Sequence, residues 1–267
     1  MEQDGNGGSE AGRDLGRELG DEAPASIRDS APDYLAPIDA SAPVSGHSPA
    51  PESTSSPADA PEHDWSRARS LLYPAFRPVG TQGLQLESID RETFVARPSQ
   101  SHAQPLLDVG PAELPVVYTI DAGAYDIVVN GDHLLAWGVG PADIQDAAMD
   151  NLAAWSASAP WTDEVSGDRR LISSDTGNGW DAVRILLPEV TAHLTAELGS
   201  VGRILVGIPE RHLMTAGSLR PGDDDFASLF ADFILEQSGG ADEPIDRRVF
   251  ELVDGRLVEF VGVGSGA

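Results

Sequence analysis

Residues 170–216 have the sequence RLISSDTGNGWDAVRILLPEVTAHLTAELGSVGRILVGIPERHLMTA, and this stretch decides the fold. Its first residues predict a strand, and a loop with Gly177 and Gly179 follows. Pro188 suits the first turn of a helix. Two apolar runs then flank a sharp turn at Pro209, a residue that is disfavoured in a central strand. Together these elements predict an α+β fold of mixed, mainly antiparallel strands and about three to four helices.

Two further strands and a helix are expected before this stretch. Residues 114–121, LPVVYTID, are β-branched and aromatic, and residues 125–137, YDIVVNGDHLLAW, form a second apolar run. Asn130-Gly131 lies inside the second run, and this pair favours a tight turn between strand residues. His133 is therefore expected in a strand. A helix should begin at Pro141.

The helix from Pro141 has one apolar face. At 100° per residue, this face contains Ile144, Ala148, Leu152 and Trp155. Asn151 lies near the middle of the face, where a buried amide needs hydrogen-bond partners. We therefore expect Asn151 to tie the helix to a neighbouring loop, and the alternative is a ligand-binding role.

The segments on either side of these strands are less regular. Residues 66–72 predict a short helix that stops before Pro74, because proline ends a helix. Residues 94–96 predict a strand fragment. Residues 160–169, PWTDEVSGDR, are expected to be a connector.

The C-terminal part predicts a capped helix and a hairpin. Residues 223–225 are three Asp that precede Phe and Leu at helical spacing. Carboxylates favour a helix N-terminus, so we expect capping here, and cation binding is the alternative. Asp254-Gly255 lies between two apolar runs and predicts the turn of a hairpin.

Residues 1–64 differ from the rest of the chain. They are rich in Gly, Ser, Pro, Asp and Glu and poor in large apolar residues. Because such a composition buries too little surface to offset chain entropy, we predict a disordered acidic tail. A single α+β domain is expected over residues 65–267. Within the tail, Tyr34 and Leu35 are either a docking point for a partner or the domain, or a chance apolar pair.

Composition excludes several classes of partner and chemistry. The chain has 44 Asp and Glu against 17 basic residues, all of them Arg, and a formal charge of −27. This charge repels phosphate backbones and anionic membranes, so no nucleic-acid partner and no membrane partner are expected. The absence of Cys removes disulfides and thiolate chemistry. No apolar run approaches the roughly 20 residues of a membrane span and no signal peptide is visible, so the cytoplasm is the expected location.

The glycine loop contains the first candidate site residues. Asp175, Asn178 and Asp181 are three residues apart, with glycines between them. The backbone N–H groups of such a loop could hold an anion, but a phosphate loop would need a Lys that the chain lacks. The structural alternative is that Asp181 caps the following turn. Arg184 would then pair with Asp181 or Asp175 across the loop.

Arg211 and His212 are the remaining candidates, at the tip of the turn that follows Pro209. A His beside an Arg and a carboxylate could transfer protons, although a His at a turn is more often simply solvated. The sequence has no metal-binding, nucleophile or dinucleotide motif. We therefore predict no metal site and no cofactor.

The same motifs resemble those of the YtpQ-like family, a bacterial group of unknown function. The resemblance is carried by NGWDAVRIL and VGIPERHLM within residues 175–214, and by flanking segments in the family's order over residues 114–260. It implies a small cytoplasmic α+β domain and supplies no reaction. The chain departs from the family in its acidic N-terminal part and at residues 210–212.

Two functions follow from these observations. The first is a non-enzymatic binding or protein-interaction module that contacts a protein partner through its tail or its domain surface. The alternative is an enzyme of unidentified type, such as a hydrolase, with a site between the Gly177 loop and the Pro209 turn. That alternative requires Asp175, Asp181, Arg184 and His212 to converge in one cleft.

Overall fold

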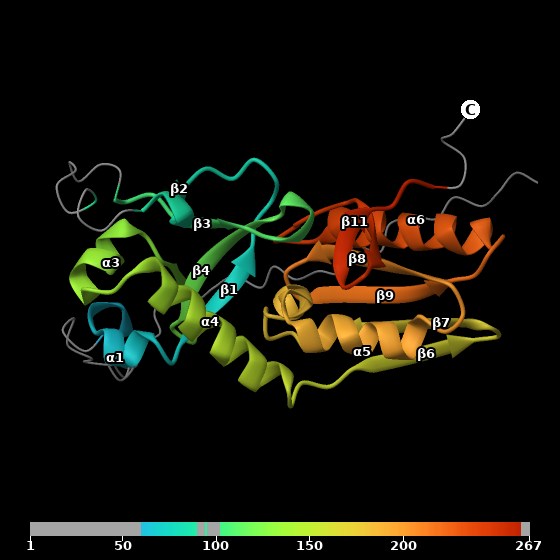
Figure 1. Cartoon of the computed structure of the whole chain (residues 1–267), viewed down its shortest axis with the longest axis horizontal. Coiled ribbons are helices and arrows are strands. Elements are labelled where there is room, and N and C mark those ends of the chain that lie inside the picture. Colours follow the sequence, from blue (N-terminus) through green and yellow to red (C-terminus); the bar gives the residue numbers. More distant parts are fainter. Residues whose placement is uncertain (1–59, 90–93, 95–101, 263–267) are drawn as a thin grey trace, which may run out of the picture. The chain divides into compact units, whose positions relative to one another are not determined.

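The computed structural model describes residues 60–89, 94 and 102–262 of the chain (Figure 1). All of these residues belong to one compact unit, Ser53–Ala267. They form two mainly antiparallel sheets and five α-helices, which confirms the predicted α+β class. Two predictions lie outside the described residues. The apolar pair Tyr34 and Leu35 does so wholly, and the strand fragment at residues 94–96 does so except for residue 94.

Five α-helices are found in the described part of the chain: α1 (Trp65–Ala68), α3 (Gly131–Trp137), α4 (Pro141–Ser156), α5 (Pro188–Leu198) and α6 (Asp224–Gly240). Short 3-10 helices lie before α1 and between several of the described strands: η2 (Pro61–His63), η3 (Leu86–Ser88), η5 (Pro111–Glu113) and η6 (Ala182–Leu186). None of these helices combines the length and the apolar character that crossing a membrane requires.

The regular structure begins before residue 65, inside the segment that the sequence assigns to the tail. Asp64 accepts a hydrogen bond from the backbone N–H of Ser66 at 2.9 Å and so caps α1. The indole of Trp137 donates to the carbonyl of Glu62 at 2.8 Å. These two contacts fix residues 61–64 against the domain.

The first sheet has five strands: β1 (Leu72–Phe76), β2 (Leu84–Gln85), β3 (Leu106–Val109), β4 (Pro115–Asp121) and β5 (Asp126–Val128). Their order is β1-β4-β3-β2, and β5 also pairs with β4. The helix predicted over residues 66–72 is shorter than expected, because α1 ends at Ala68 and β1 begins at Leu72. Pro74 lies within β1, which an edge strand tolerates because the missing N–H is not needed by a second neighbour.

Asn130-Gly131 does not form a hairpin turn, so this prediction is wrong. Asn130 instead caps α3, and its side chain accepts from the backbone N–H of His133 at 3.2 Å. Asn is favoured both in turns and at helix N-termini, and here the second preference applies. His133 therefore lies in a helix. The turn that joins β4 to β5 is at residues 122–125.

The helix α4 packs against β1 as its apolar pattern predicts. Ile144, Ala148 and Leu152 are fully buried. The amide of Asn151 donates to the carbonyls of Arg69 at 2.8 Å and Leu72 at 2.9 Å. This confirms that Asn151 ties the helix to the loop between α1 and β1.

The second sheet has six strands: β6 (Thr162–Ser166), β7 (Arg169–Ser174), β8 (Arg203–Glu210), β9 (Leu213–Leu219), β10 (Val249–Val253) and β11 (Arg256–Glu259). Their order is β11-β10-β8-β9-β7-β6. Residues 160–169 are therefore not a plain connector, because they contain the edge strand β6. All five residues of β6 are exposed, which explains why the sequence shows no apolar alternation there.

The helices α5 and α6 cover opposite faces of the second sheet (Figure 1). Ile204, Val206 and Ile208 of β8 share a core cluster with Leu194 of α5, whereas Leu205 belongs to the cluster of α6. Because successive strand side chains point to opposite faces, the two helices must lie on different sides. Coverage on both faces accounts for the unbroken apolar run of β8.

The turns of the second sheet lie close to their predicted places. β8 continues through Pro209 to Glu210, with a register shift that accommodates the proline in a central strand. Asp254 and Gly255 have φ of 51° and 74° and form the predicted hairpin turn between β10 and β11. Asp223 caps α6 by accepting from the backbone N–H of Phe226 at 3.2 Å, as predicted.

Candidate functional site

A buried carboxylate anchors the glycine loop. Asp181 is fully buried and accepts from the Ser174 hydroxyl at 2.6 Å. It also accepts from the backbone N–H of Thr176 at 3.0 Å and from its hydroxyl at 2.9 Å. The Asp181 side chain forms no capping hydrogen bond with η6, so the predicted cap is wrong. Its contacts run back to the end of β7 and close the loop onto that strand.

Arg184 lies behind the loop, in the core. Its side chain is 1% exposed and donates to the hydroxyls of Ser174 at 2.8 Å and Ser156 at 3.0 Å. It also donates to three backbone carbonyls within residues 156–160. The guanidinium lies 3.8 Å from the ring centre of Trp161, an arrangement that cation–π attraction stabilises. The segment that joins α4 to β6 therefore wraps around Arg184.

The hydroxyl of Ser174 connects the two buried charges. It donates to Asp181 and accepts from Arg184, so the charges interact through one hydroxyl and form no direct ion pair. The predicted direct pairing of Arg184 with Asp181 or Asp175 is wrong. Burial lowers the pKa of Arg184, and the charge of Asp181 opposes this effect. Asp175 is exposed and accepts from the Thr162 hydroxyl at 3.3 Å.

A polar pocket of about 340 Å³ lies on the outer side of the loop. Three segments border it: the turn between β4 and β5, the glycine loop, and the turn between β8 and β9. Asn178, Arg211 and His212 line this pocket, so the structure brings three of the six predicted site residues together. Asp126, from β5 in the other sheet, also lines it.

Arg211 connects the two sheets across this pocket. It forms an ion pair with Asp126, and its Nη1 lies 3.2 Å from a carboxylate oxygen of Glu243. Its Nε donates to the carbonyl of Gly179 at 3.1 Å. Gly179 has φ of +82°, and an added Cβ there would lie 2.6 Å from the Arg211 side chain. Sequence reasoning missed Asp126 because it lies 85 residues away in the chain.

His212 lines the same polar pocket. Its Nδ1 is buried and has no hydrogen-bond partner within the part of the chain that the structure describes. His212 also borders a second pocket of about 410 Å³, which Glu210, Glu236 and Glu243 line. Across residues 60–89, 94 and 102–262, no group of three or more His, Cys, Asp or Glu could hold a metal ion.

The four residues that the enzyme alternative requires do not line one pocket. His212 faces the polar pocket, whereas Asp181 and Arg184 are buried behind the loop and Asp175 contacts Thr162. Asp181 and Arg184 thus serve to build the core of the second sheet. No nucleophile and base therefore face each other among these predicted residues.

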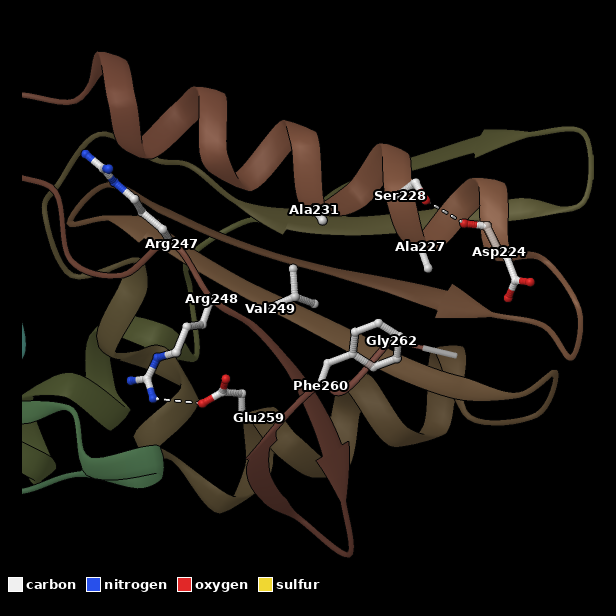
Figure 2. A pocket seen from close by; sticks show the side chains of 10 residues that line it. All are labelled: Asp224, Ala227, Ser228, Ala231, Arg247, Arg248, Val249, Glu259, Phe260 and Gly262. Atoms are coloured by element: carbon white, nitrogen blue, oxygen red, sulfur yellow. Dashed lines mark hydrogen bonds and ion pairs between the residues drawn. The ribbon is translucent and has the colours of Figure 1, made fainter. Parts of the chain in front are cut away.

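One flank of α6 carries small residues and leaves a hollow. Ala227, Ser228 and Ala231 border a pocket of about 580 Å³ against the ends of β10 and β11 (Figure 2). Arg248 lines this pocket but forms ion pairs with two carboxylates, Asp246 at 2.7 Å and Glu259 at 3.3 Å. The charge of Arg248 is therefore compensated within the protein.

The other flank of α6 forms an apolar groove with β6 and β7, called here the α6 groove. It has a volume of about 280 Å³ and is lined by Glu164, Ser166, Arg169, Leu171, Phe226, Leu229, Phe230 and Phe233. The sequence places the apolar residues Phe226, Leu229, Phe230 and Phe233 at helical spacing. The structure divides them, because Phe226 and Phe230 are buried whereas Leu229 is 58% exposed and Phe233 is 38% exposed.

Comparison with protein-family models, with curated proteins and with solved structures finds no match to this chain.

Proposed function

We propose that this chain is a non-enzymatic protein-interaction module that binds an extended partner segment along β6 and the α6 groove. The observation that carries the proposal is an apolar groove next to a sheet edge that no other described strand pairs with. Proteins recognise extended segments by adding a strand to such an edge, and pockets beside the edge then select alternate side chains.

The groove follows from the width of the apolar stripe on α6. Phe226, Phe230 and Ile234 recur at helical spacing and bury against the sheet. Leu229 and Phe233 are displaced to one side of this stripe and remain partly exposed beside β6 and β7. Large apolar side chains that line a hollow without filling it are typical of binding surfaces.

The edge strand supplies the backbone groups that strand addition needs. β6 is the last strand of its sheet and pairs only with β7 within the described residues. Its outer side therefore presents backbone N–H and C=O groups to solvent. Both requirements of strand addition, a free edge and an adjacent apolar groove, are met at one place.

The proposed function predicts a partner whose binding depends on Phe233. Phe233→Asp places a charge in the groove, whereas Leu235→Asp places the same charge on an exposed position of α6 that does not line the groove. We expect full-length protein to capture a partner from lysate that Leu235→Asp retains and Phe233→Asp loses. The captured partner is then purified and its affinity for the three proteins measured. Equal affinity for Phe233→Asp and the unchanged chain would contradict the proposal.

Residues 1–64 are a second route to a protein partner, as the sequence suggests. A chain that lacks residues 1–59, and so keeps the contacts of Glu62 and Asp64 with the domain, should keep every partner that depends on Phe233. Loss of all partners on this deletion would instead place the interaction in the N-terminal part. We also propose the cytoplasm as the location and the YtpQ-like family as the relative of this chain, both from the sequence.

A further inference from the structure

The α6 groove contains one carboxylate, that of Glu164, without a partner among the described residues. Glu164 is exposed and lines the groove, and its carboxylate forms no hydrogen bond or ion pair with any described residue. The neighbouring cations are already compensated. Arg169 pairs with Asp223 at 2.6 Å, and Arg170 pairs with two carboxylates at 2.7 Å each. The groove thus combines an apolar wall with one uncompensated negative charge.

We propose that the partner segment is basic: an Arg or Lys faces Glu164, and an apolar side chain two positions away enters the α6 groove. This inference rests on the proposed function and specifies the chemistry of the partner. An unpaired charge beside an apolar surface favours a ligand that both supplies the opposite charge and covers the apolar surface.

The spacing of two follows from the register of β6. Glu164 and Ser166 line the groove, so Asp163 and Val165 point to the opposite face of the sheet. A strand added to β6 continues this alternation. Residues two positions apart in the partner therefore share the groove side, one beside Glu164 and the other beside the apolar wall.

The charges on β6 disfavour two other occupants. In a second copy of the chain, Asp163 and Glu164 would approach carboxylates of the same sign, and each copy carries a formal charge of −27. Residues 1–64 of the same chain are also strongly acidic. A basic segment is the occupant whose charges would be attracted to these carboxylates.

A peptide-display selection tests the inference even though the natural partner is unidentified. Random nine-residue peptides are selected on the full-length protein at physiological salt, which screens non-specific attraction between exposed charges. Peptides that also bind the groove variant Phe233→Asp are removed from the selection. Of the rest, peptides that still bind the control variant Leu235→Asp are kept. Leu229→Asp serves as a second groove variant if thermal unfolding shows that Phe233→Asp does not fold. We expect the surviving peptides to carry Arg or Lys two positions from a large apolar residue.

A charge-matched pair of variants then tests the role of Glu164. Glu164→Gln removes the carboxylate at the groove, and Glu189→Gln removes an exposed carboxylate of α5 that does not line the groove. Since an exposed ion pair contributes modestly, we expect Glu164→Gln to weaken the selected peptides about two- to fivefold in fluorescence anisotropy, and Glu189→Gln to leave them unchanged.

The outcomes separate this inference from the proposed function. Basic peptides that depend on both Phe233 and Glu164 support it. Peptides that depend on Phe233 but lack basic residues, or that respond equally to Glu164→Gln and Glu189→Gln, overturn the inference and leave the proposed function standing. If no peptide depends on Phe233 or Leu229, both are overturned.

Discussion

Replacement of Ser174 by Ala should destabilise the fold far more than the same change one residue earlier. Ser174 is fully buried, and its hydroxyl is the only link between the carboxylate of Asp181 and the guanidinium of Arg184 within the described hydrogen bonds. Ser173 is half-buried and shares one hydrogen bond with the Thr215 hydroxyl at 2.9 Å. Both residues lie in β7, so strand propensity cancels in the comparison.

The magnitude follows from the bonds that each variant loses. A hydrogen bond to a charged group contributes about 1.5–3 kcal/mol, and Ser174→Ala removes two of them. We therefore expect the free energy of unfolding to fall by about 3–6 kcal/mol. Ser173→Ala removes one bond between neutral groups, so its expected cost is about 1 kcal/mol.

Urea unfolding followed by tryptophan fluorescence measures both variants, because Trp161 lies against Arg184 and reports on this part of the core. The comparison is valid if the dependence of the unfolding free energy on urea is the same for the two proteins. A loss for Ser174→Ala no larger than that for Ser173→Ala would refute the hydroxyl bridge between the buried charges.

Three further predictions concern single side chains. Gly179→Ala should lower the free energy of unfolding, measured in urea, more than Gly177→Ala does. Both glycines have positive φ, but only at Gly179 would the added methyl collide with the Arg211 side chain. Asn151→Ala leaves two backbone carbonyls without their side-chain donor, so the free energy of unfolding should fall by about 1–3 kcal/mol in thermal and urea unfolding. An unchanged free energy of unfolding would contradict the view that Asn151 ties α4 to the loop between α1 and β1. Burial lowers the pKa of His133, so the folded state favours the neutral imidazole. The free energy of unfolding that this contributes is fully present above pH 6.5 and is lost as the pH falls through the folded-state pKa. An imidazole pKa at or above 6.5 in an NMR titration of the folded protein would contradict this.

Local signals in the sequence were sufficient wherever one preference had no competitor. The helix α4 begins at Pro141 and its apolar face is buried as its periodicity predicts. Asp223 caps α6, and Asp254-Gly255 turns the last hairpin. In each case a short pattern has a single structural solution, so neighbouring residues alone determine the result.

The errors arose where one pattern serves two structures or where no pattern exists. Asn130-Gly131 suits a hairpin turn as well as a helix start, and the structure shows the helix start, with Leu134 of α3 buried. The strand β6 has no apolar alternation, because its five residues are all exposed and no described segment covers either of its faces. Its strand conformation follows from pairing with β7, which periodicity does not reveal.

The candidate site shows the same division between local and long-range information. Residues of the glycine loop are candidate site residues in the sequence. In the structure, however, the side chains of Asp181 and Arg184 form their hydrogen bonds within the core. Their partners Ser174 and Ser156 are ordinary residues whose importance depends on the three-dimensional path of the chain. An isolated buried charge is costly, so its hydrogen-bonding groups are engaged inside the protein and are not offered to a ligand.

The surface that supports a binding function is made of residues that the sequence presents as core. Leu229 and Phe233 have the spacing of buried helix residues, and a wider sheet would cover them. They stay partly exposed because the sheet ends at β6, whose own residues pack against nothing on their outer side within the described chain. Whether an apolar residue belongs to a core or to a binding surface is thus decided by where the sheet ends. In this protein that edge also carries Glu164, so the position that leaves the apolar side chains uncovered also gives them a charge that a basic partner can match.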